Sequence, residues 1–454
     1  MYHCGPTVYN YAHIGNLRAY VFADILRRTF EHEGYQVNQV INITDVGHLV
    51  SDADEGEDKM ERGARREGKT AREIALFYED AFMHDLELLN IRTNGTLFPR
   101  ASEHIPEQIA LIQKLEEKGV TYRTEDGIYF DTSKISDYGK LDRENIAGLK
   151  EGARIEKNAE KRNITDFALW KFSKPGEKRQ QEWDSPWGKG FPGWHLECSA
   201  MAMKYLGETF DIHTGGIDHI QIHHTNEIAQ SETATGKVFS RYFLHVAFVN
   251  VAEGKMSKSE ENFLRLETLA EQGIHPLYYR YSILTAHYRS QITFSWEALE
   301  AARSALDALF AFFSPRVGKG IGSVSGTYMD RFKACLADDL NTPQAIAVLF
   351  ELIKDEHIPE ATKIATIAQF DHILGLGLTE RFSELERELL SKTIHLEDVP
   401  AEIRTLIAKR EEAREKKDWQ EADLLRDNIE KQGYTIQDGE QGPVISRKNR
   451  PTAK

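Results

Sequence analysis

Residues 194–227 bring together side chains whose types and spacing suit metal binding. Cys198 offers a thiolate, and His223 and Glu227 offer an imidazole and a carboxylate four residues apart. On one helix that spacing turns both side chains the same way, and zinc accepts such a mixed set in tetrahedral geometry. We predict that these three residues bind a zinc ion with Cys4 as the fourth ligand. The alternative is that Cys198 is a small buried core residue, where free cysteine usually lies.

Residues 13–16, with the sequence His-Ile-Gly-Asn, suit phosphate binding. They stand between an expected strand and an expected helix, which is where ligands bind in α/β folds. Gly15 lets a ligand approach the backbone, His13 and Asn16 can donate to phosphate oxygens, and the helix N-terminus favours negative charge. A turn histidine without a ligand is the alternative interpretation of His13.

Two further motifs point to a nucleotide. In the sequence 255–259, Lys255 and Lys258 are three residues apart and flanked by serines, which suits a mobile clamp on a triphosphate. A solvated basic turn is the alternative. Gly216 adds a point of close backbone approach, and Asp218 a carboxylate for ribose hydroxyls.

Composition limits the class of protein. The chain has 454 residues, 41% of them hydrophobic and 28% charged, which is ordinary for a globular protein. It has no apolar run long enough to span a membrane. Three widely separated cysteines predict a reducing compartment, and we expect a cytoplasmic protein. The net charge of −15 argues against a strong nonspecific nucleic-acid binder, but not against a local basic surface.

The elements that must position these residues begin with a βαβ unit. A strand at residues 2–4, a helix ending near Gly34 and a strand with apolar residues at alternate positions over 35–43 predict a parallel sheet. Residues 51–70 are expected to form a loop, and a hairpin is expected around 126–127. Further helices are expected at 193–205 and around 223–227, with a strand at 209–212 between them. Residues 264–313 are expected to be helical.

The second part of the chain differs in character. Residues 317–326 are rich in glycine and serine and predict a linker. Residues 329–378 predict helices, with Asn341 capping one of them. A charged helix pair is expected at 403–430 and a small hairpin at 434–447. The fold class is therefore α/β: a Rossmann-like parallel-sheet domain with a mixed α/β insertion, then a helical bundle and a small C-terminal α/β piece.

These motifs together resemble a known family. The sequences at 13–16 and 255–259 are similar to the two signatures of class I aminoacyl-tRNA synthetases. Residues 2–9, 42–46, 192–201 and 223–230 resemble cysteinyl-tRNA synthetases in particular. The resemblance runs from Met1 to about Arg447, with the motifs in the family's order. Family members carry a further segment before the position of Tyr2, so we expect this chain to lack its first segment.

The resemblance implies a domain plan and an activity. The plan is a catalytic domain in two halves (1–97 and 191–260), a connective insertion (98–190), a signature-loop region that contacts the tRNA stem (261–316), an anticodon-binding helical domain (327–380), a small C-terminal domain (399–447) and a basic tail (448–454). The implied activity is ligation of L-cysteine to tRNA(Cys) by a monomer through cysteinyl-adenylate, with ATP and Mg²⁺ and one zinc ion per chain.

The resemblance also implies roles for particular residues. Zinc is bound by Cys4, Cys198, His223 and Glu227; cysteine is contacted by Thr44, Trp194 and His224; ATP is contacted by His13, Gly15, Asn16, Gly216, Asp218 and Lys258; and Lys255 joins His13, Asn16 and Lys258 in catalysis. This chain departs from the family pattern at Asn16, where the strict signature has a second histidine, and at 47–49, Ile222 and Thr225.

A zinc ion would explain how the protein selects cysteine over serine. Shape alone separates cysteine from serine weakly, whereas zinc binds a thiolate far better than an alcohol. Selection by binding needs no editing domain, and the insertion at 98–190 is short for one. Two alternatives stay open at this point: a cysteine ligase that acts on an amino sugar, and an inactive RNA-binding paralogue. Ligases of the first kind lack the domains that residues 329–447 resemble.

Overall fold

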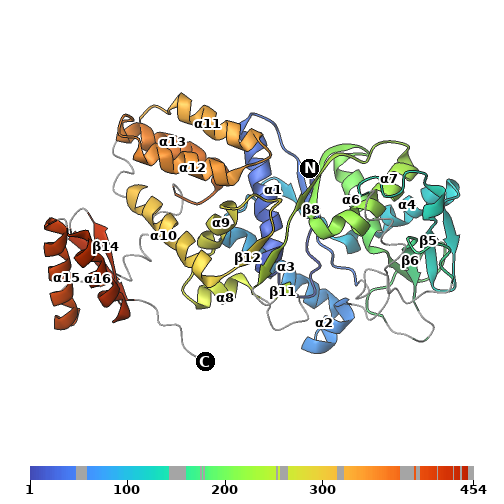
Figure 1. Ribbon diagram of the computed structural model, residues 1–454. Coiled ribbons are helices and arrows are strands. Elements are labelled where there is room, and N and C mark those ends of the chain that lie inside the picture. Colours follow the sequence, from blue (N-terminus) through green and yellow to red (C-terminus); the bar gives the residue numbers. More distant parts are fainter. Residues whose placement is uncertain are drawn as a thin grey trace.

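The computed structural model describes residues 1–47, 59–142, 160–173, 176, 179–251, 254–255, 264–313, 322–378, 393–394, 399–416, 418–432, 434–439 and 442–447. A five-stranded sheet lies at its centre, in the order β3 (Thr96–Leu97), β2 (Gln39–Ile41), β1 (Tyr2–His3), β8 (Phe210–Gly216) and β9 (Ser240–Val246) (Figure 1). All four pairings are parallel, as the βαβ pattern predicted. The parallel-sheet part of the fold class is therefore confirmed.

The strand β1 is short but central. Tyr2 pairs with Val40 on one side and with His213 on the other, so the two halves of the sheet meet on it. Gly34 follows the helix that connects β1 to β2, and it has a positive φ of 86°, as expected of a glycine that terminates a helix. The expected strand at 35–43 was too long: continuous pairing is confined to β2, Ile43 adds an isolated bridge to Arg100, and Tyr35 is 64% exposed.

Among the described residues, three helices follow β1 in the first part of the chain and flank β2 in the sequence. The helix α1 (Ile14–His32) follows β1 directly, and it buries twelve of its side chains. The helices α2 (Lys59–Glu67) and α3 (Ala71–Leu88) follow. The expected loop at 51–70 is therefore wrong over α2, where Met60 and Ala64 are buried one helical turn apart; residues 51–58 lie outside the described residues.

The insertion forms a separate antiparallel sheet. Its order is β4 (Thr121–Arg123), β5 (Gly127–Phe130), β6 (Phe167–Phe172) and β7 (Gly190–Pro192). The predicted hairpin is confirmed by the pairing of β4 with β5. Short turns η1 (Ala101–His104) and η2 (Thr132–Lys134) and the helix α4 (Ile105–Glu117) complete it, and Figure 1 shows this part on the opposite side of the molecule from the helical bundle.

The chain then returns to the parallel sheet through α6 (Trp194–Leu206), and β8 follows. After β8 come a 3₁₀ turn η3 (Ile217–His219), a π turn η4 (Ile220–His224) and α7 (Thr225–Thr235). A second small sheet, in the order β11 (Gly254–Lys255), β10 (Val249–Val251) and β12 (Ile292–Phe294), lies beyond β9. The region 264–313 is helical over α8 (Leu266–Glu271), α9 (Pro276–Leu284) and α10 (Trp296–Phe313), but β12 was not expected there.

The helical part contains α11 (Gly326–Ala337), α12 (Thr342–Lys354) and α13 (Glu360–Leu374). The predicted cap is confirmed, because the Asn341 side chain accepts from the Gln344 amide at 3.2 Å. The C-terminal piece contains α15 (Ala401–Glu415), α16 (Trp419–Lys431) and a sheet in the order β13 (Thr393–Ile394), β15 (Gly442–Arg447) and β14 (Tyr434–Gly439). Of the expected linker only 322–326 is described, and the tail 448–454 lies outside the described residues.

A buried charge cluster joins α1 and α9 to the helical part. Asp24 of α1 forms ion pairs with Arg28 at 2.8 Å and with Arg280 of α9 at 2.6 Å. Arg280 also donates to the carbonyl of Leu374, and Arg28 to that of His372, both near the end of α13. The carbonyl end of a helix favours cations, so these arginines fix α13 against α1.

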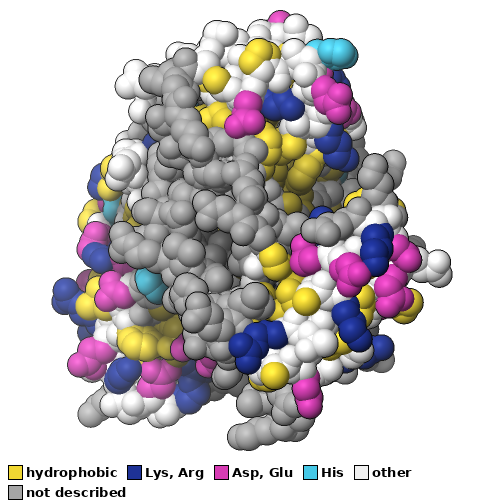
Figure 2. Space-filling view, turned by 90° about the vertical axis from the view of Figure 1, so that its left-hand side faces the viewer, with side chains coloured by type: hydrophobic (Ala, Val, Ile, Leu, Met, Phe, Trp, Pro, Cys, Tyr) yellow, Lys and Arg dark blue, Asp and Glu magenta, His cyan; other side chains and the backbone are white. Residues whose placement is uncertain are grey.

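The surface carries charges of both signs, as expected from the 28% of residues that are charged. Figure 2 shows acidic and basic side chains interspersed on the face that it presents. Among the described residues, no helix is both long and apolar enough to cross a membrane.

Candidate functional site

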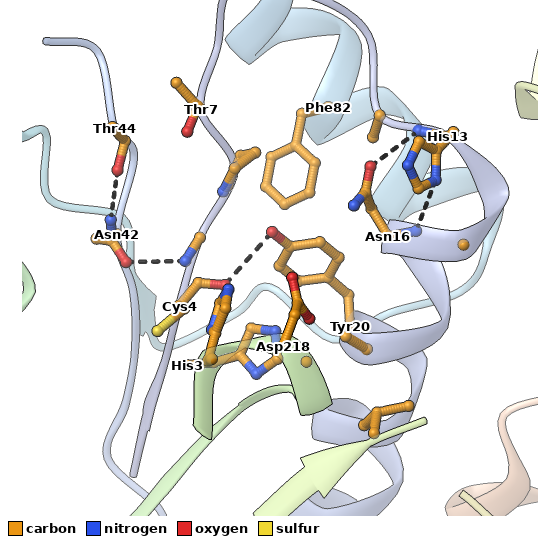
Figure 3. Close-up of a pocket in the computed structure, with 18 of the residues that line it drawn as sticks. His3, Cys4, Thr7, His13, Asn16, Tyr20, Asn42, Thr44, Phe82 and Asp218 are labelled. Carbon is orange, nitrogen blue, oxygen red and sulfur yellow. Dashed lines mark hydrogen bonds between the residues drawn. The ribbon is translucent and has the colours of Figure 1, made fainter. Parts of the chain in front are cut away.

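A cavity of about 350 Å³ lies at the carboxyl ends of β1 and β8 (Figure 3). Ligands bind at this edge of a parallel sheet, because the loops there converge from both halves of the chain. Both halves line it here, together with the segment between β9 and β10. The lining includes most of the residues singled out in the sequence: Cys4, His13, Gly15, Asn16, Thr44, Trp194, Cys198, Gly216, Asp218 and His223.

The four residues predicted to bind zinc converge at one end of this cavity. Their ligand atoms all lie within 4.8 Å of one another, and all four side chains are buried. Cys4 follows β1, Cys198 stands on α6, and His223 and Glu227 stand on the π turn and on α7. The π turn differs from the single α-helix that we expected; such wider turns occur often at functional sites.

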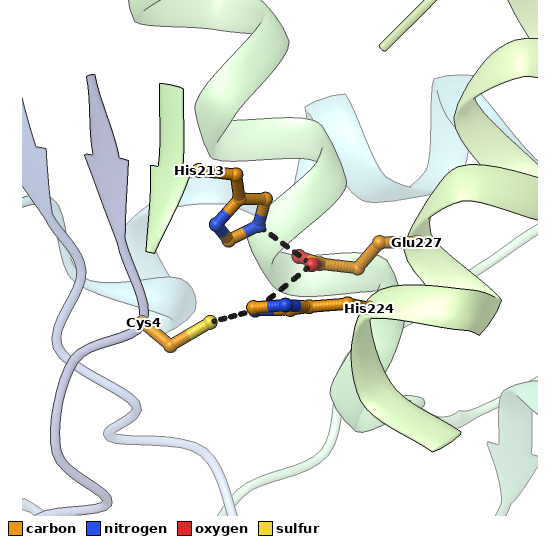
Figure 4. Close-up of side chains that lie close together, drawn as sticks. All are labelled: Cys4, His213, His224 and Glu227. Carbon is orange, nitrogen blue, oxygen red and sulfur yellow. Dashed lines mark hydrogen bonds and ion pairs between the residues drawn. The ribbon is translucent and has the colours of Figure 1, made fainter. Parts of the chain in front are cut away.

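A second, overlapping set is equally compact. It keeps Cys4 and Glu227 but replaces the other two residues with His213 and His224 (Figure 4). Nε2 of His213 lies 2.7 Å from Oε2 of Glu227. A carboxylate only accepts, so this contact is a hydrogen bond donated by the imidazole. Two nitrogen or oxygen ligands of one zinc ion lie roughly 3.3–3.4 Å apart, which makes the pair too close to share an ion.

The donor geometry favours the first set. Oε1 of Glu227 lies 3.7 Å from Nε2 of His223, close to the separation of two ligands on one ion. The hydrogen bond from His213 holds the other carboxylate oxygen, as residues that orient metal ligands commonly do. Among the described residues, Oε1 of Glu227 has no hydrogen-bond donor although it is fully buried. The residues therefore fit a zinc ion, with His213 as support rather than ligand.

Burial makes this cluster costly without a cation. It raises the pKa of the Cys4 thiol well above its usual value, and the neighbouring Cys198 adds to the effect. The pKa of Cys198 is raised as well, mainly by burial. Two thiols and a carboxylate packed in an apolar interior would be stabilised as anions by a bound metal ion.

His224 lies behind the metal cluster and is not part of the cavity lining. Its Nε2 is 3.3 Å from the Cys4 sulfur, and its Nδ1 is 2.8 Å from Nε2 of His245. Burial, with the nearby His213, lowers the pKa of His224 well below its usual value, so the ring is neutral. We expected His224 to contact the amino-acid substrate; its contact with Cys4 does not test this, and the role stays a prediction.

Asn42 organises the wall beside Cys198. Its side chain donates to the Thr44 hydroxyl at 3.0 Å and accepts from the Gly5 amide at 2.8 Å. The Cys198 thiol lies 3.7 Å from the same oxygen. Across the site, the ring of Trp194 lies 4.3 Å from the ring of His223, centroid to centroid. Thr44 and Trp194 thus stand next to the metal cluster.

The nucleotide motif forms the N-terminal cap of α1. Nδ1 of His13 accepts from the Asn16 amide at 3.0 Å, and the Asn16 side chain accepts from the His13 amide at 3.3 Å (Figure 3). This reciprocal pair is a capping box, in which the Asn16 side chain satisfies the His13 amide at the start of the helix. A Cβ on Gly15 would lie 3.0 Å from the His13 ring, so a side chain there would press on the ring and shift it.

Of the other residues predicted to contact ATP or to act in catalysis, Gly216 and Asp218 line the cavity, and of Lys255 and Lys258 only the backbone of the first is described. A Cβ on Gly216 would lie 2.4 Å from a carboxylate oxygen of Asp218, so a side chain there would displace the carboxylate from the cavity edge. The backbone of Lys255 pairs with that of Asn250 in the β10–β11 hairpin. The side chain of Lys255 and the whole of Lys258 lie outside the described residues.

Sequence reasoning missed two supporting residues, His213 and Asn42. His213 is a fully buried imidazole within a strand, two residues before Gly215. A polar residue at a buried strand position needs a partner, and that was the available signal. Asn42 stood in one of the segments that carried the resemblance, but its type alone gave no role.

Comparison with known proteins agrees with this arrangement. The family model of the class I (C) catalytic domain of tRNA synthetases matches residues 1–304, the DALR domain matches 331–378, and the cysteinyl-tRNA ligase anticodon binding domain matches 396–442. Cysteine–tRNA ligase 1 of Burkholderia lata is 51% identical over 444 residues, covering 97% of this chain and 91% of its own. Cysteine–tRNA ligase of Treponema denticola is 45% identical, covering 96% and 93%.

Solved structures agree on the fold. Mycobacterium tuberculosis methionyl-tRNA synthetase in complex with methionyl-adenylate superposes with a TM-score of 0.56 at 15% identity, covering 86% of this chain and 93% of its own. At that identity the likeness concerns the fold alone. The catalytic family model covers residues 1–304, and relatives match nearly the whole chain. The chain therefore belongs to the cysteinyl-tRNA ligase family of class I tRNA synthetases.

Proposed function

We propose that this chain activates L-cysteine with ATP to cysteinyl-adenylate and transfers the cysteine to tRNA(Cys). The observation that carries this proposal is the single cavity described above. It joins a sulfur-rich metal cluster at one end to a helix N-terminus with phosphate-binding chemistry at the other. An amino acid bound at the first end and ATP bound at the second would meet between them.

We propose that Cys4, Cys198, His223 and Glu227 hold one zinc ion. Such an ion would supply a coordination position that takes a thiolate and disfavours a hydroxyl. Thr44 and Trp194, which adjoin this cluster, would bound the rest of the amino-acid pocket. Selection of cysteine over serine would then occur at binding.

The chain's own residues would position ATP by fixed donors. The capping box fixes the His13 ring and orients the Asn16 amide at the N-terminus of α1, where the helix dipole favours phosphate. The Asp218 carboxylate would accept hydrogen bonds from ribose hydroxyls, next to Gly216, whose lack of a side chain leaves its backbone open to close approach. Lys255 and Lys258 would add cationic contacts to the triphosphate.

In the first step the cysteine carboxylate attacks the α-phosphorus of ATP, and pyrophosphate leaves; magnesium, when bound, would neutralise part of the phosphate charge. In the second step a hydroxyl of the terminal ribose of the tRNA attacks the adenylate carbonyl, and AMP leaves. Neither step needs a protein nucleophile, so the enzyme's contribution is positioning and stabilisation of phosphate charge. The matches at 331–378 and 396–442 favour tRNA over an amino sugar as the acceptor.

Cysteine-dependent ATP–pyrophosphate exchange, followed by charging of tRNA(Cys), tests this function. We expect exchange with cysteine and little with serine at equal concentration, and we expect tRNA(Cys) to be charged. Exchange without charging, with transfer to an amino sugar, would replace the acceptor in this proposal. Absence of both reactions in zinc-loaded protein would show an inactive relative.

A further inference from the structure

Arg18 is a buried cation held by carbonyl oxygens. Its Nη1 donates to the carbonyls of Ala247 at 2.8 Å and Phe248 at 3.1 Å. Its Nη2 donates to those of His287 at 3.1 Å and Ser290 at 2.8 Å. The side chain is only 2% exposed. A planar guanidinium that donates to two backbone segments at once fixes their relative position, which lysine could not do as well.

The first of these segments is a wall of the cavity. Residues 246–249 line it together with His13 and Asn16, and they continue into the β10–β11 hairpin that contains Lys255. Arg18 stands on the same helix as the two capping residues, half a turn after Asn16. It therefore connects the phosphate-binding end of α1 to the strand that enters the second signature sequence.

The same helix start holds the chain beyond that sequence. The amide of Ile14 donates to the carbonyl of Leu264 at 2.9 Å, and the Arg265 guanidinium lies over the Tyr11 ring at 4.3 Å. Backbone on both sides of residues 256–263 is thus fixed to residues 11–18. Of these contacts, only those of Arg18 reach a second loop as well.

That second loop, residues 287–290, is another place where the helical part docks, apart from the cluster around Asp24. His287 donates to the Asp339 carbonyl at 2.9 Å, the Tyr288 hydroxyl donates to its carboxylate at 2.6 Å, and Arg289 pairs with that carboxylate at 2.6 Å. Asp339 and Leu340 both have positive φ angles, 53° and 54°, which non-glycine residues rarely adopt. Strained backbone of this kind is often retained for a function.

We propose that Arg18 is a positioning residue for ATP, which holds the 246–249 wall against α1 and links that wall, through the 287–290 loop, to the Asp339 turn of the helical part. This inference deepens the proposed function and rests on it for the meaning of the nucleotide end. Its observable consequence is selective: disturbing Arg18 or Asp339 changes ATP binding and leaves the metal-bound amino-acid end unchanged. A purely structural role would lower stability without that selectivity.

The test uses the full chain with Arg18→Gln, Arg18→Lys and Asp339→Asn. We expect Arg18→Gln to raise the Kd of Mg-ATP, measured by calorimetry without cysteine, and to lower kcat/KM for ATP in exchange by about 10-fold to 100-fold, because a displacement near 1 Å can reduce the rate by up to about 100-fold. Zinc content and the KM for cysteine should not change. Arg18→Lys should recover part of the loss, and Asp339→Asn should show a smaller rise in the same direction.

Arg27→Gln is the matched control. Arg27 is also buried on α1 and also donates to carbonyls, those of Arg92 and Asn94, but these lie away from the cavity. Equal ATP binding by Arg18→Gln and wild type would overturn the inference, as would an equal rise in Arg27→Gln. If Arg18→Gln does not fold, unchanged ATP affinity in both Arg18→Lys and Asp339→Asn would overturn it. Calorimetry reads ATP binding even if exchange is absent, so failure of the proposed function remains distinguishable.

Discussion

His213→Phe should weaken zinc binding without abolishing it. The replacement keeps an aromatic ring among Tyr2, Phe210 and Phe243, and it removes the donor to Glu227. A hydrogen bond to a charged group contributes about 1.5–3 kcal/mol, and 1.4 kcal/mol corresponds to a factor of ten. Supporting donors in metal sites affect affinity by about 10-fold to 100-fold, which agrees. We therefore expect zinc affinity to fall by about one to two orders of magnitude.

The assay is competition for zinc against a chromophoric chelator at pH 7, with metal content measured on the same samples. Cys198→Ser should lose far more affinity than His213→Phe, since it removes a proposed ligand. Cys335→Ser is the matched control, because Cys335 lies on α11 outside the cluster and should leave zinc unchanged. Wild-type affinity in Cys198→Ser together with complete loss in His213→Phe would refute the reasoning and assign the ion to the other set.

Three further predictions concern other parts of the molecule. Gly15→Ala should raise the KM for ATP in exchange with little change in melting temperature, because the new Cβ displaces the His13 ring; an unchanged KM would contradict this. Burial raises the pKa of Asp85 from 3.8 to about 7, so the folded state keeps this proton to a higher pH than the unfolded state does, and stability falls between pH 4 and 7. Asp85→Asn should therefore raise the melting temperature more at pH 8 than at pH 5. An equal rise at both pH values would be inconsistent with this reasoning. Arg280→Met removes one of the buried cationic partners of Asp24 and should lower the free energy of unfolding, measured in urea, by about 3–5 kcal/mol. A loss below about 1 kcal/mol is typical of exposed ion pairs and would show that this cluster is not effectively buried.

Local signals in the sequence predicted local structure well. The cap at Asn341, the hairpin of β4 and β5 and the end of α1 at Gly34 each depend on a few neighbouring residues, and each is confirmed. The helix α2 was missed because its many charges suggested a loop. The spacing of Met60 and Ala64, both buried, was the helical signal that those charges concealed.

Features that depend on residues far apart in the sequence were harder to predict. Spacing alone suggested that His223 and Glu227 share a helix face, but no sequence rule predicts that His223 lies in a π turn that leads into the α-helix of Glu227. The bond from His213 and the bonds of Arg18 to two loops join residues far apart in the chain. Such contacts follow from the packing of the sheet, and a single sequence without relatives gives no measure of them.

The position of β1 has a consequence for biosynthesis. It is made early, yet it lies in the middle of the sheet, and Thr214 must emerge before His3 has its second partner. At roughly 5–20 residues per second, this leaves one edge of β1 open for about 10–40 s on the ribosome. An open strand edge can pair with another chain, so a nascent chain is vulnerable to aggregation during this interval. Cys4 and Glu227 come together only when that edge closes, so zinc uptake should follow synthesis of the catalytic half rather than guide it.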